Sequence, residues 1–279
     1  MVSRRAWLAA ATARLTEAGC EDAAFDARCL LEDLGGLPRG HVADETPLTD
    51  AQLSVLTAAL GERVNGRPLQ YILGEWDFLS LTLKVGEGVL IPRPDTELLC
   101  EVAAAQLRGR PTPAVLDLCA GSGCVGLGVA SLHPTAQVTA VELSDAALGY
   151  LRQNVSRYPQ YAVGVRQSNV LTDYTAFDGP YDAILSNPPY IPTADLSSLQ
   201  KEVQREPQMA LDGDADGLTF YRTIAEHWCG KLAPDGFCAV EVGIGQAEDV
   251  AALFAASGLE NTAIYPDLAG IPRVVLARK

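Results

Sequence analysis

A strand, a glycine-rich loop, a helix and a second strand follow one another between residues 114 and 142, and this order constrains the fold more than any other feature. The apolar run 114–118 predicts a strand, and the small residues 124–130 predict the start of a helix. Gly121, Gly123 and Gly126 have the spacing G-x-G-x-x-G. Glycine at these positions lets the backbone approach a ligand and lets the helix pack closely on the strand. The segment therefore predicts a βαβ unit of a parallel sheet.

Glu142 ends the second strand, 137–142, where its carboxylate could accept both hydroxyls of a ribose. Ligands of open α/β sheets bind at the carboxyl ends of the strands. A ribose-bearing ligand is thus predicted across the top of the sheet. The alternative is an ordinary βαβ turn with a solvated acid, and the order of strand, loop, helix, strand and terminal acid makes it the weaker interpretation.

Asn187-Pro188-Pro189-Tyr190 follows a further apolar strand, 181–186. Pro188 ends that strand and biases Asn187 toward an extended backbone, while Pro189 stiffens the turn. The Asn187 side-chain oxygen and the Pro188 carbonyl accept hydrogen bonds, and Tyr190 adds an aromatic ring. Such a set suits the gripping of a planar NH2 group through both of its hydrogens. Alone, the tetrapeptide is equally compatible with a surface turn, and the glycine-rich segment decides in favour of a site.

Nicotinamide dinucleotides and S-adenosylmethionine can both bind to this kind of half-fold. A hydride-transfer enzyme has no need of two oxygens and a ring aimed at an amino group, whereas a methyltransferase that acts on a planar nitrogen does. A strand signal near 162–165 leads to Asn169 and Val170, where an adenine amino group could be held. The cofactor predicted from these residues is S-adenosylmethionine.

The formal net charge of −14 argues against nucleic acid as a direct partner. Residues 1–75 already carry 7 Arg and Lys against 11 Asp and Glu, and the rest is acidic too. Attraction to phosphates needs the opposite balance. The seven cysteines are scattered without a C-x-x-C pair and there are only three histidines, so neither a metal site nor a disulfide framework is predicted. Reduced cysteines and the lack of any membrane-length apolar run predict a cytoplasmic protein without a membrane partner.

The 279 residues are enough for two domains, one of them small. Helical patterns over 4–18, 23–34 and 49–64 predict a helical domain at 1–74, and Thr49 with Gln52 forms a capping-box signal. Strand patterns at 76–83 and 88–91 predict a β-hairpin linker at 75–91. The remainder, 92–279, is predicted as an α/β domain with a seven-stranded, mostly parallel sheet whose last two strands form a hairpin.

Two segments are expected near the site. Arg93 stands between two prolines in a rigid corner before a helix with an acidic first turn, which suits the helix dipole. This corner serves equally well as a domain junction or as a wall of the substrate mouth.

The polar segment 194–217 contains an acidic run, 212–217, that superficially resembles a Ca²⁺ loop without its closing Glu. It is predicted as a loop that covers the active site.

Together these motifs resemble the HemK/PrmC family, whose members methylate the N5 amide of a glutamine in peptide-chain release factors. The resemblance extends through nearly the whole chain and rests on the order and spacing of its motifs. These are residues 67–74, 90–98, 117–124, 187–191, 206–207, 210–211, 216–218, 241–243, 246, 267–270 and 273. The segment Pro-Arg-Pro-Asp-Thr-Glu separates this family from its relative acting on a large-subunit ribosomal protein. It also separates it from N6-adenine DNA methyltransferases, which share Asn-Pro-Pro-Tyr.

The resemblance implies a Rossmann-like class I methyltransferase domain after a helical domain that docks a class 1 release factor. The acceptor would be the glutamine of the factor's Gly-Gly-Gln loop, the enzyme would support translation termination, and it is expected to be a monomer. The residues predicted to bind the cofactor are Cys119, Ala120, Gly121, Ser122, Gly123, Glu142, Asn169, Val170 and Asn187. Those predicted to bind the substrate are Arg93, Thr96, Asn187, Pro188, Pro189 and Tyr190, of which Asn187, Pro188 and Tyr190 are predicted to be catalytic.

The chain departs from the family pattern at two of these positions. The family usually has Asp where Glu142 stands, and often Asp where Asn169 stands. Glu142 can still reach a ribose diol with its longer arm, and Asn169 can still accept from an adenine amino group without charge assistance. The affinity for the cofactor is what these differences affect.

Two other functions remain open from the sequence. Methylation of a ribosomal-protein glutamine, or of an adenine N6 in nucleic acid, would use the same planar NH2 group. A partner-binding protein with a vestigial cofactor fold is the other alternative. The intact glycine loop and the intact residues 187–190 argue against such decay.

Overall fold

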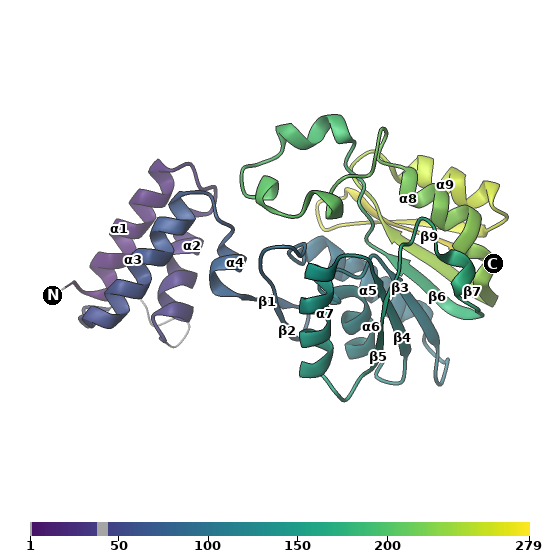
Figure 1. Cartoon of the computed structure of the whole chain (residues 1–279), viewed down its shortest axis with the longest axis horizontal. Helices are drawn as coiled ribbons and strands as arrows, with labels where there is room; N and C mark the ends of the chain where they lie inside the picture. Colours follow the sequence, from purple (N-terminus) through teal and green to yellow (C-terminus); the bar gives the residue numbers. More distant parts are fainter. Residues whose placement is uncertain (1, 38–43) are drawn as a thin grey trace. The chain divides into compact units, whose positions relative to one another are not determined.

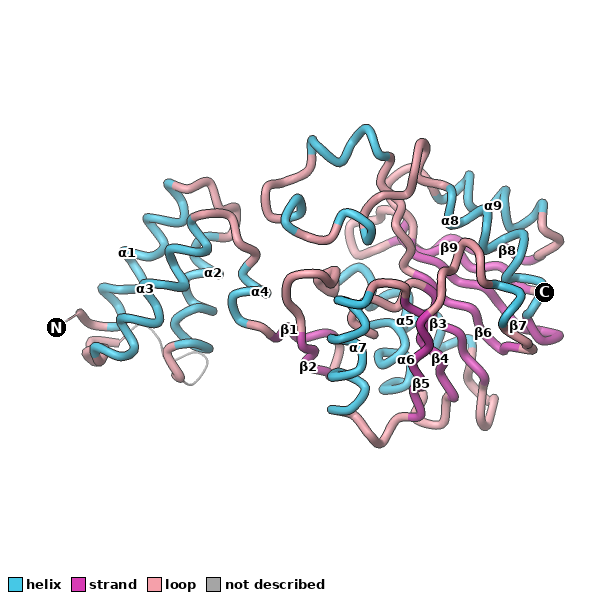
Figure 2. The backbone as a smooth tube through the Cα atoms, viewed as in Figure 1, coloured by secondary structure: helices cyan, strands magenta, loops and turns pink. Residues whose placement is uncertain are grey.

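The computed structural model describes residues 2–37 and 44–279. The chain forms two compact units (Figures 1 and 2). The first is the chain up to Glu75 together with Gln200–Arg205, and the second is Trp76–Leu199 with Glu206–Lys279. The division at 75/76 lies one residue from the predicted one at 74/75. The assignment of 200–205 to the helical unit was not predicted. Within the described ranges, no helix has the length and apolar character needed to cross a membrane.

The first unit is helical. Its elements are α1 (Arg4–Glu17), α2 (Ala23–Cys29), the π-helical turn η1 (Leu30–Leu34), α3 (Asp50–Val64) and α4 (Leu69–Leu73). The capping box is present, because the Thr49 hydroxyl accepts from the Gln52 N–H and the Gln52 side chain accepts from the Thr49 N–H. Leu15, Leu30 and Leu56 are fully buried between the helices. The three predicted helices are confirmed, with the second changing to a π-turn at Leu30, and α4 is additional.

A buried arginine joins the segment 200–205 to this unit. Arg63 Nε donates to Asp26 Oδ2 at 2.6 Å and its Nη1 donates to Glu202 Oε1 at 2.8 Å. The side chains of Arg63 and Asp26 are each only 8% exposed. A guanidinium carries donors enough for both carboxylates, so the pairing satisfies charges that would be costly to bury alone.

The hairpin is shorter than predicted. Its strands are β1 (Glu75–Phe78) and β2 (Leu81–Lys84), joined at Leu79, whose φ is +51°. The Leu79 N–H donates to Glu97 Oε1 at 2.8 Å, which holds a turn that lacks the usual glycine or asparagine. The predicted return strand at 88–91 is therefore wrong, because the return strand is β2 at Leu81–Lys84. Residues 86–89 instead form a turn in which the Val89 N–H donates to the Gly86 carbonyl, and no strand follows at 90–91.

The second unit contains a seven-stranded sheet in the order β5-β4-β3-β6-β7-β9-β8. The strands are β3 (Ala114–Leu118), β4 (Gln137–Glu142), β5 (Ala162–Gln167), β6 (Tyr181–Ser186), β7 (Leu232–Glu241), β8 (Glu260–Pro266) and β9 (Pro272–Arg278). β9 runs antiparallel to both β7 and β8, and the other pairs are parallel. The predicted seven-stranded sheet with a final hairpin is confirmed. The strand order reverses between β3 and β6, and such a switch point opens a crevice at the carboxyl ends of the two strands.

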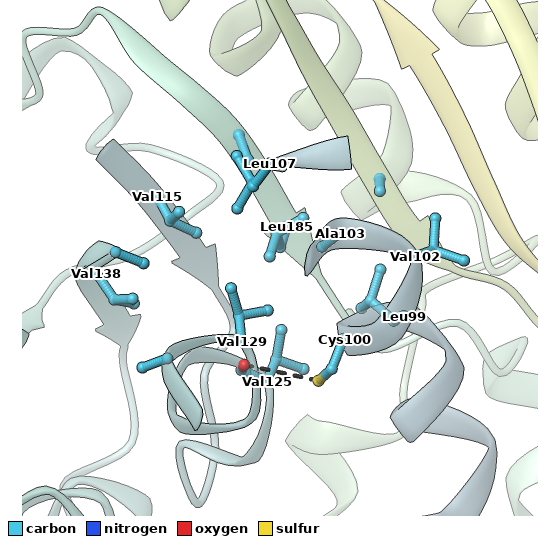
Figure 3. Close-up of a cluster of buried hydrophobic side chains, with 14 of the residues drawn as sticks. Leu99, Cys100, Val102, Ala103, Leu107, Val115, Val125, Val129, Val138 and Leu185 are labelled. Carbon is cyan, nitrogen blue, oxygen red and sulfur yellow. Dashed lines mark hydrogen bonds between the residues drawn. The ribbon is translucent and has the colours of Figure 1, made fainter. Parts of the chain in front are cut away.

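Helices cover both faces of this sheet. They are α5 (Pro94–Gln106), α6 (Cys124–Leu132), α7 (Asp145–Arg157), α8 (Thr219–Thr223), the π-turn η6 (Ile224–Trp228) and α9 (Ala247–Ala256). The 3₁₀ turns of this unit are η2 (Tyr174–Ala176), η3 (Thr193–Ser198), η5 (Gln208–Ala210) and η7 (Cys229–Lys231), while η4 (Val203–Arg205) belongs to the helical unit. Alternate strand residues point to opposite faces. Val115 and Leu185 face α5 and α6, as Figure 3 shows, whereas Leu116 and Ile184 pack in the cluster that contains Phe254 of α9. Burial on both faces fixes the register, and thereby the strand ends that carry the site.

Candidate functional site

A cavity of about 400 Å³ lies at the carboxyl ends of β3, β4 and β6. Its volume is in the range of small-molecule sites, about 300–1,000 Å³. Of the residues predicted for the site, the cavity is lined by Arg93, Thr96, Cys119, Ala120, Gly121, Ser122, Glu142, Asn169, Val170, Asn187 and Pro189. Gly123, Pro188 and Tyr190 are not among the described residues that line it. The fold therefore brings together side chains separated by about a hundred residues in the sequence.

The glycine loop has the backbone conformation that its composition predicts. Gly121 has a φ of +55° and a Cβ there would meet no atom within 4 Å, so the loop leaves open space beside its backbone. Gly123 has a φ of +85°, and a Cβ there would lie 2.6 Å from Leu151 Cδ1. Gly123 is thus needed for packing against α7. The Gly126 N–H donates to Asp117 Oδ2 at 2.9 Å, and burial raises the pKa of Asp117 to about 7.

Glu142 is held by the loops that flank it. Its Oε2 accepts from the Gly121 N–H at 2.8 Å, and its Oε1 accepts from the N–H groups of Leu143 and Ser144 at 2.8 and 2.7 Å. The bond from Gly121 holds the carboxylate against the glycine loop, and the bonds from Leu143 and Ser144 hold it against the start of α7. A carboxylate has about four lone-pair positions, so acceptor capacity remains on the side of Oε2.

Asn169 begins a turn that a neighbouring acid holds in place. Asn169 Oδ1 accepts from the Leu171 N–H at 2.9 Å. Asp173 Oδ2 accepts from the Asn169 N–H at 2.8 Å and from the Ser168 hydroxyl at 3.0 Å. These hydrogen bonds keep the pKa of Asp173 below its usual range. Asp173 was not predicted, because its contribution depends on a turn that the local pattern did not reveal.

Asn187 lies directly after β6 with a defined side-chain orientation. The Ser186 hydroxyl donates to the Leu118 carbonyl at 2.7 Å and ties the end of β6 to the end of β3. Asn187 Nδ2 donates to Thr96 Oγ1 at 3.1 Å. Because the amino half of this amide is used by Thr96, the oxygen Oδ1 is the half left for a ligand in the cavity.

Tyr190 packs against the core rather than along the cavity wall. Its ring is half-buried beside the apolar cluster of α8 and α9, and burial raises its pKa to about 12. Its carbonyl accepts from Gln246 Nε2 at 2.9 Å, while Gln246 Oε1 accepts from the Gly243 N–H at 2.9 Å. Gln246 therefore connects the turn after β6 to the turn after β7.

The acidic run packs against the turn 187–191. The Ile191 N–H donates to the Leu211 carbonyl at 2.9 Å, and the Gly213 N–H donates to the Ile191 carbonyl at 2.8 Å. A Cβ on Gly213 would lie 2.8 Å from Tyr190 Cα, so glycine permits this approach. Asp212 and Asp214 line the cavity. This part of the segment 194–217 thus forms a wall of the site and supports the turn.

Arg93 is paired with Glu206, which the sequence did not assign to the site. An Arg93 Nη2 donates to Glu206 Oε1, and Glu206 Oε2 accepts from the Ile91 N–H at 2.9 Å. The Glu206 side chain is only 2% exposed. The ion pair fixes the corner before α5 against the segment after residue 205. Six further lining residues lie in the corner and the covering loop that the sequence predicted near the site, namely Pro92, Pro207, Met209, Ala210, Asp212 and Asp214. The lining residues that sequence reasoning missed are Gly88, Val89, Leu90, Ile91, Cys124, Val125, Val141, Leu143, Ser144, Ala147, Ser168, Leu171, Thr219 and Phe220.

The lining fits S-adenosylmethionine. Residues 124–127, the first turn of α6, include no acidic side chain, so the positive end of this helix is available to a carboxylate. Glu142 offers an acceptor suited to hydroxyls, and Val141, Leu143 and Val170 give apolar walls. Asn169 adds a polar group among these walls. These groups thus match the three parts of S-adenosylmethionine, namely its amino acid, its ribose and its adenine.

Replacement of Glu142 by Gln is expected to weaken S-adenosylmethionine binding about 10- to 100-fold, since hydrogen bonds to a charged acceptor contribute about 1.5–3 kcal/mol. The uncharged amide also binds the loop N–H groups less tightly. Titration calorimetry measures the affinity. Glu248→Gln, at an exposed position of α9, is the matched control. An unchanged Kd in Glu142→Gln would contradict this role.

Two family models match the chain. The PrmC N-terminal domain matches residues 6–74, and the methyltransferase small domain matches residues 94–211. A release factor glutamine methyltransferase from Geobacter sulfurreducens is 42% identical over 95% of this chain and 92% of its own length. One from Rhodospirillum rubrum is 39% identical over 100% of this chain and 84% of its own length.

A solved methyltransferase from Pyrococcus furiosus shares the fold. It is 17% identical, with a TM-score of 0.53, and the match covers 72% of this chain and 90% of that one. At this identity the similarity concerns the fold alone. The identity to the curated relatives, over nearly the full length of both chains, shows more: this chain belongs to the family of release factor glutamine methyltransferases.

Proposed function

We propose that this protein transfers a methyl group from S-adenosylmethionine to the N5 amide nitrogen of the glutamine in the Gly-Gly-Gln motif of class 1 peptide-chain release factors. The membership of the family supports this substrate, since the curated relatives carry the name release factor glutamine methyltransferase. One observation of the structure carries the proposal. Asn187 donates through Nδ2 to Thr96, which leaves Oδ1 as an acceptor in a cavity that fits the cofactor.

The chemical difficulty is the poor nucleophilicity of an amide nitrogen, whose lone pair is delocalised into the carbonyl. S-adenosylmethionine supplies an activated methyl group when bound. Asn187 Oδ1 and the Pro188 carbonyl accept the two N–H bonds of the glutamine amide and orient its nitrogen. Fixing a reacting group in this way contributes on the order of 7–11 kcal/mol in favourable cases. Both oxygens also stabilise the positive charge that develops on nitrogen, because they are fixed dipoles aimed at it.

The other residues of the site act through shape. Pro189 lines the cavity and stiffens the turn that presents Asn187. Tyr190 anchors this turn through its carbonyl bond to Gln246, and because its ring packs against the core, it is proposed to act by supporting the turn rather than by pressing on the substrate amide. Arg93 and Thr96 are proposed to form the wall where the glutamine enters. No strong base is required, because the amide N–H becomes acidic only as the new bond forms, and its proton leaves to solvent.

The helical unit is proposed to dock the release factor. It carries the match to the PrmC N-terminal domain over residues 6–74, and it contains no residue that lines the cavity among those described. The division of labour would then be recognition by residues 1–74, a hairpin linker, and catalysis by residues 92–279. We further propose a cytoplasmic monomer that acts without direct binding of nucleic acid.

Incubation of the purified protein with labelled S-adenosylmethionine and a recombinant class 1 release factor tests the function. Peptide mass spectrometry is expected to find one methyl group on the glutamine of the Gly-Gly-Gln motif. A factor with that glutamine replaced is the control and should stay unlabelled. Label on DNA or on a ribosomal protein, with none on the factor, would overturn the substrate while keeping the reaction type.

A further inference from the structure

Two side chains from other elements, Thr96 and Glu241, lie behind the candidate catalytic amide of Asn187. Asn187 follows β6, Thr96 lies in the first turn of α5, and Glu241 is the last residue of β7. Helix α5 packs against both β6 and β7. Asn187 Nδ2 donates to Thr96 Oγ1 at 3.1 Å, and the Glu241 carboxylate lies near enough to the Thr96 hydroxyl for that hydroxyl to stabilise its charge. The three groups thus form a chain from the cavity into the interior.

Glu241 is an unusual residue to find at the end of a core strand. It is 2% exposed, and its Oε2 has no hydrogen-bond partner among the residues that the structure describes. Its backbone is fixed, because its carbonyl accepts from the Tyr221 hydroxyl at 2.8 Å and it pairs with Val274 in the sheet. A buried carboxyl with an unpaired oxygen lowers stability, so packing alone does not account for it.

Which of the groups Asn187, Thr96 and Glu241 donates to which follows from the protons that each one carries. A hydroxyl has one proton to donate and two lone pairs to accept. An ionised Glu241 can only accept, so a hydrogen bond between the two groups uses the Thr96 proton. Thr96 Oγ1 is then an acceptor toward Asn187, and only the NH2 half of the Asn187 amide can bind there.

We propose that Glu241 and Thr96 are positioning residues that hold the Asn187 amide with its oxygen directed at the substrate nitrogen. This inference rests on the proposed function and adds to it two residues that act through Asn187. Without the chain, the amide can rotate by half a turn. Its NH2 group would then oppose the NH2 group of the substrate, two donors would face each other, and the substrate nitrogen would lose its orientation.

The charge of Glu241 decides which way Thr96 donates and therefore how the Asn187 amide is oriented, so turnover should depend on pH. Burial raises the pKa of Glu241 to about 7, with the Thr96 hydrogen bond, Arg273 and Arg93 opposing this effect and Asp95 adding to it. The titratable and charged groups that face Glu241 from the surrounding elements are Arg93, Asp95, Cys100, Cys124, Tyr190, Tyr221 and Arg273. Below the pKa the carboxyl gains a proton that it can donate to Thr96 Oγ1. Thr96 can then donate to Asn187 Oδ1 and favour the wrong orientation, so kcat should fall as the pH drops through about 7.

Steady-state kinetics of four variants test this chain. Thr96→Val keeps the shape but removes the acceptor, and kcat should fall about 10²-fold, as for other losses of orientation. The KM for the release factor and the Kd for S-adenosylmethionine should stay within about twofold, since ground-state binding is little affected. Thr96→Ser restores the hydroxyl and should recover kcat. Thr223→Val, which removes a hydroxyl of α8 that donates to the Thr219 carbonyl, is the matched control. Glu241→Gln should lower kcat and abolish its dependence on pH between 6 and 8.

A measurement without substrate separates this inference from the proposed function. In the wild-type protein, ¹⁵N NMR should show the Asn187 side-chain NH2 close to the Thr96 methyl group and slow to exchange, and both signatures should vanish in Thr96→Val. If the wild type fails to methylate the factor, the proposed function falls and the NMR result alone decides the inference. A Thr96→Val enzyme with wild-type kcat would overturn the role of Thr96. A parallel loss of kcat, cofactor affinity and Tm would assign Thr96 a structural role only, and identical pH profiles for wild type and Glu241→Gln would remove Glu241 from the chain.

Discussion

Asn187→Ala is expected to lower kcat for glutamine methylation by about 10²–10³-fold, the loss seen when one preorganised hydrogen-bonding group is removed from a reacting centre. The variant loses the oxygen that orients the substrate nitrogen and stabilises its developing charge. The backbone should be unchanged, because Pro188 and Pro189 fix the turn and the Ser186 hydroxyl still bonds to the Leu118 carbonyl at 2.7 Å. The affinity for S-adenosylmethionine should change little, since Glu142 and the glycine loop are intact.

Single-turnover kinetics with saturating cofactor and release factor measure this effect, and calorimetry measures the affinity for the cofactor in the same preparation. Asn65→Ala is the matched control, because Asn65 Nδ2 donates at an exposed position to the Gly61 carbonyl in the helical unit. Turnover of Asn187→Ala close to that of the wild type would refute the central role of this amide. Loss of cofactor binding in parallel with turnover would instead move Asn187 from catalysis to cofactor binding.

Gly217→Ala is expected to destabilise the protein and to disturb the turn that carries Asn187. Gly217 has a φ of +74°, and a Cβ there would lie 2.3 Å from the Tyr190 carbonyl oxygen and 2.6 Å from Gln246 Nε2. The left-handed backbone costs about 1–2 kcal/mol for a residue with a side chain. Overpacking adds about 1–3 kcal/mol, because the nearest contact is backbone that cannot rotate away. The free energy of unfolding should thus fall by about 2–5 kcal/mol, the sum of both effects.

Urea denaturation followed by circular dichroism gives the change in stability, and kcat gives the change at the site. Gly258→Ala is the control, because Gly258 has a φ of +84° but a Cβ there would meet nothing within 4 Å. It should lose only the backbone contribution of about 1–2 kcal/mol and keep its kcat. Equal losses of stability in both variants, with equal kcat, would show that the contact with Tyr190 is unimportant.

Much of the architecture could be predicted from local patterns. The run 114–142 predicted β3, the glycine loop, α6 and β4, and the run before Asn187 predicted β6. These predictions succeeded because a strand buried on both faces is a continuous apolar run, and because glycine spacing reports backbone that must approach a ligand. The end of the hairpin was missed since Leu79 adopts its positive φ with help from Glu97, which is 18 residues away.

The composition of the site was predicted more fully than its internal contacts. Glycine spacing and the terminal acid of β4 indicated a cofactor site whose residues line the cavity. The pairing of Arg93 with Glu206, separated by 113 residues, and of Asn187 with Thr96, separated by 91, carries no signal in the local sequence. Glu241 appeared only as part of a family motif.

The order of the elements, the class of fold and the chemical groups at the strand ends can be read from local stretches of sequence, because periodicity, turn residues and acceptor chemistry are local properties. The tertiary structure alone decided which of those groups touch. Its sheet order places the ends of β6 and β7 beside the start of α5, and the resulting hydrogen bonds decide which half of the Asn187 amide is left for a substrate. The physical reason is that an amide has a donor end and an acceptor end of nearly equal shape, so only a partner fixed from elsewhere in the fold can distinguish them.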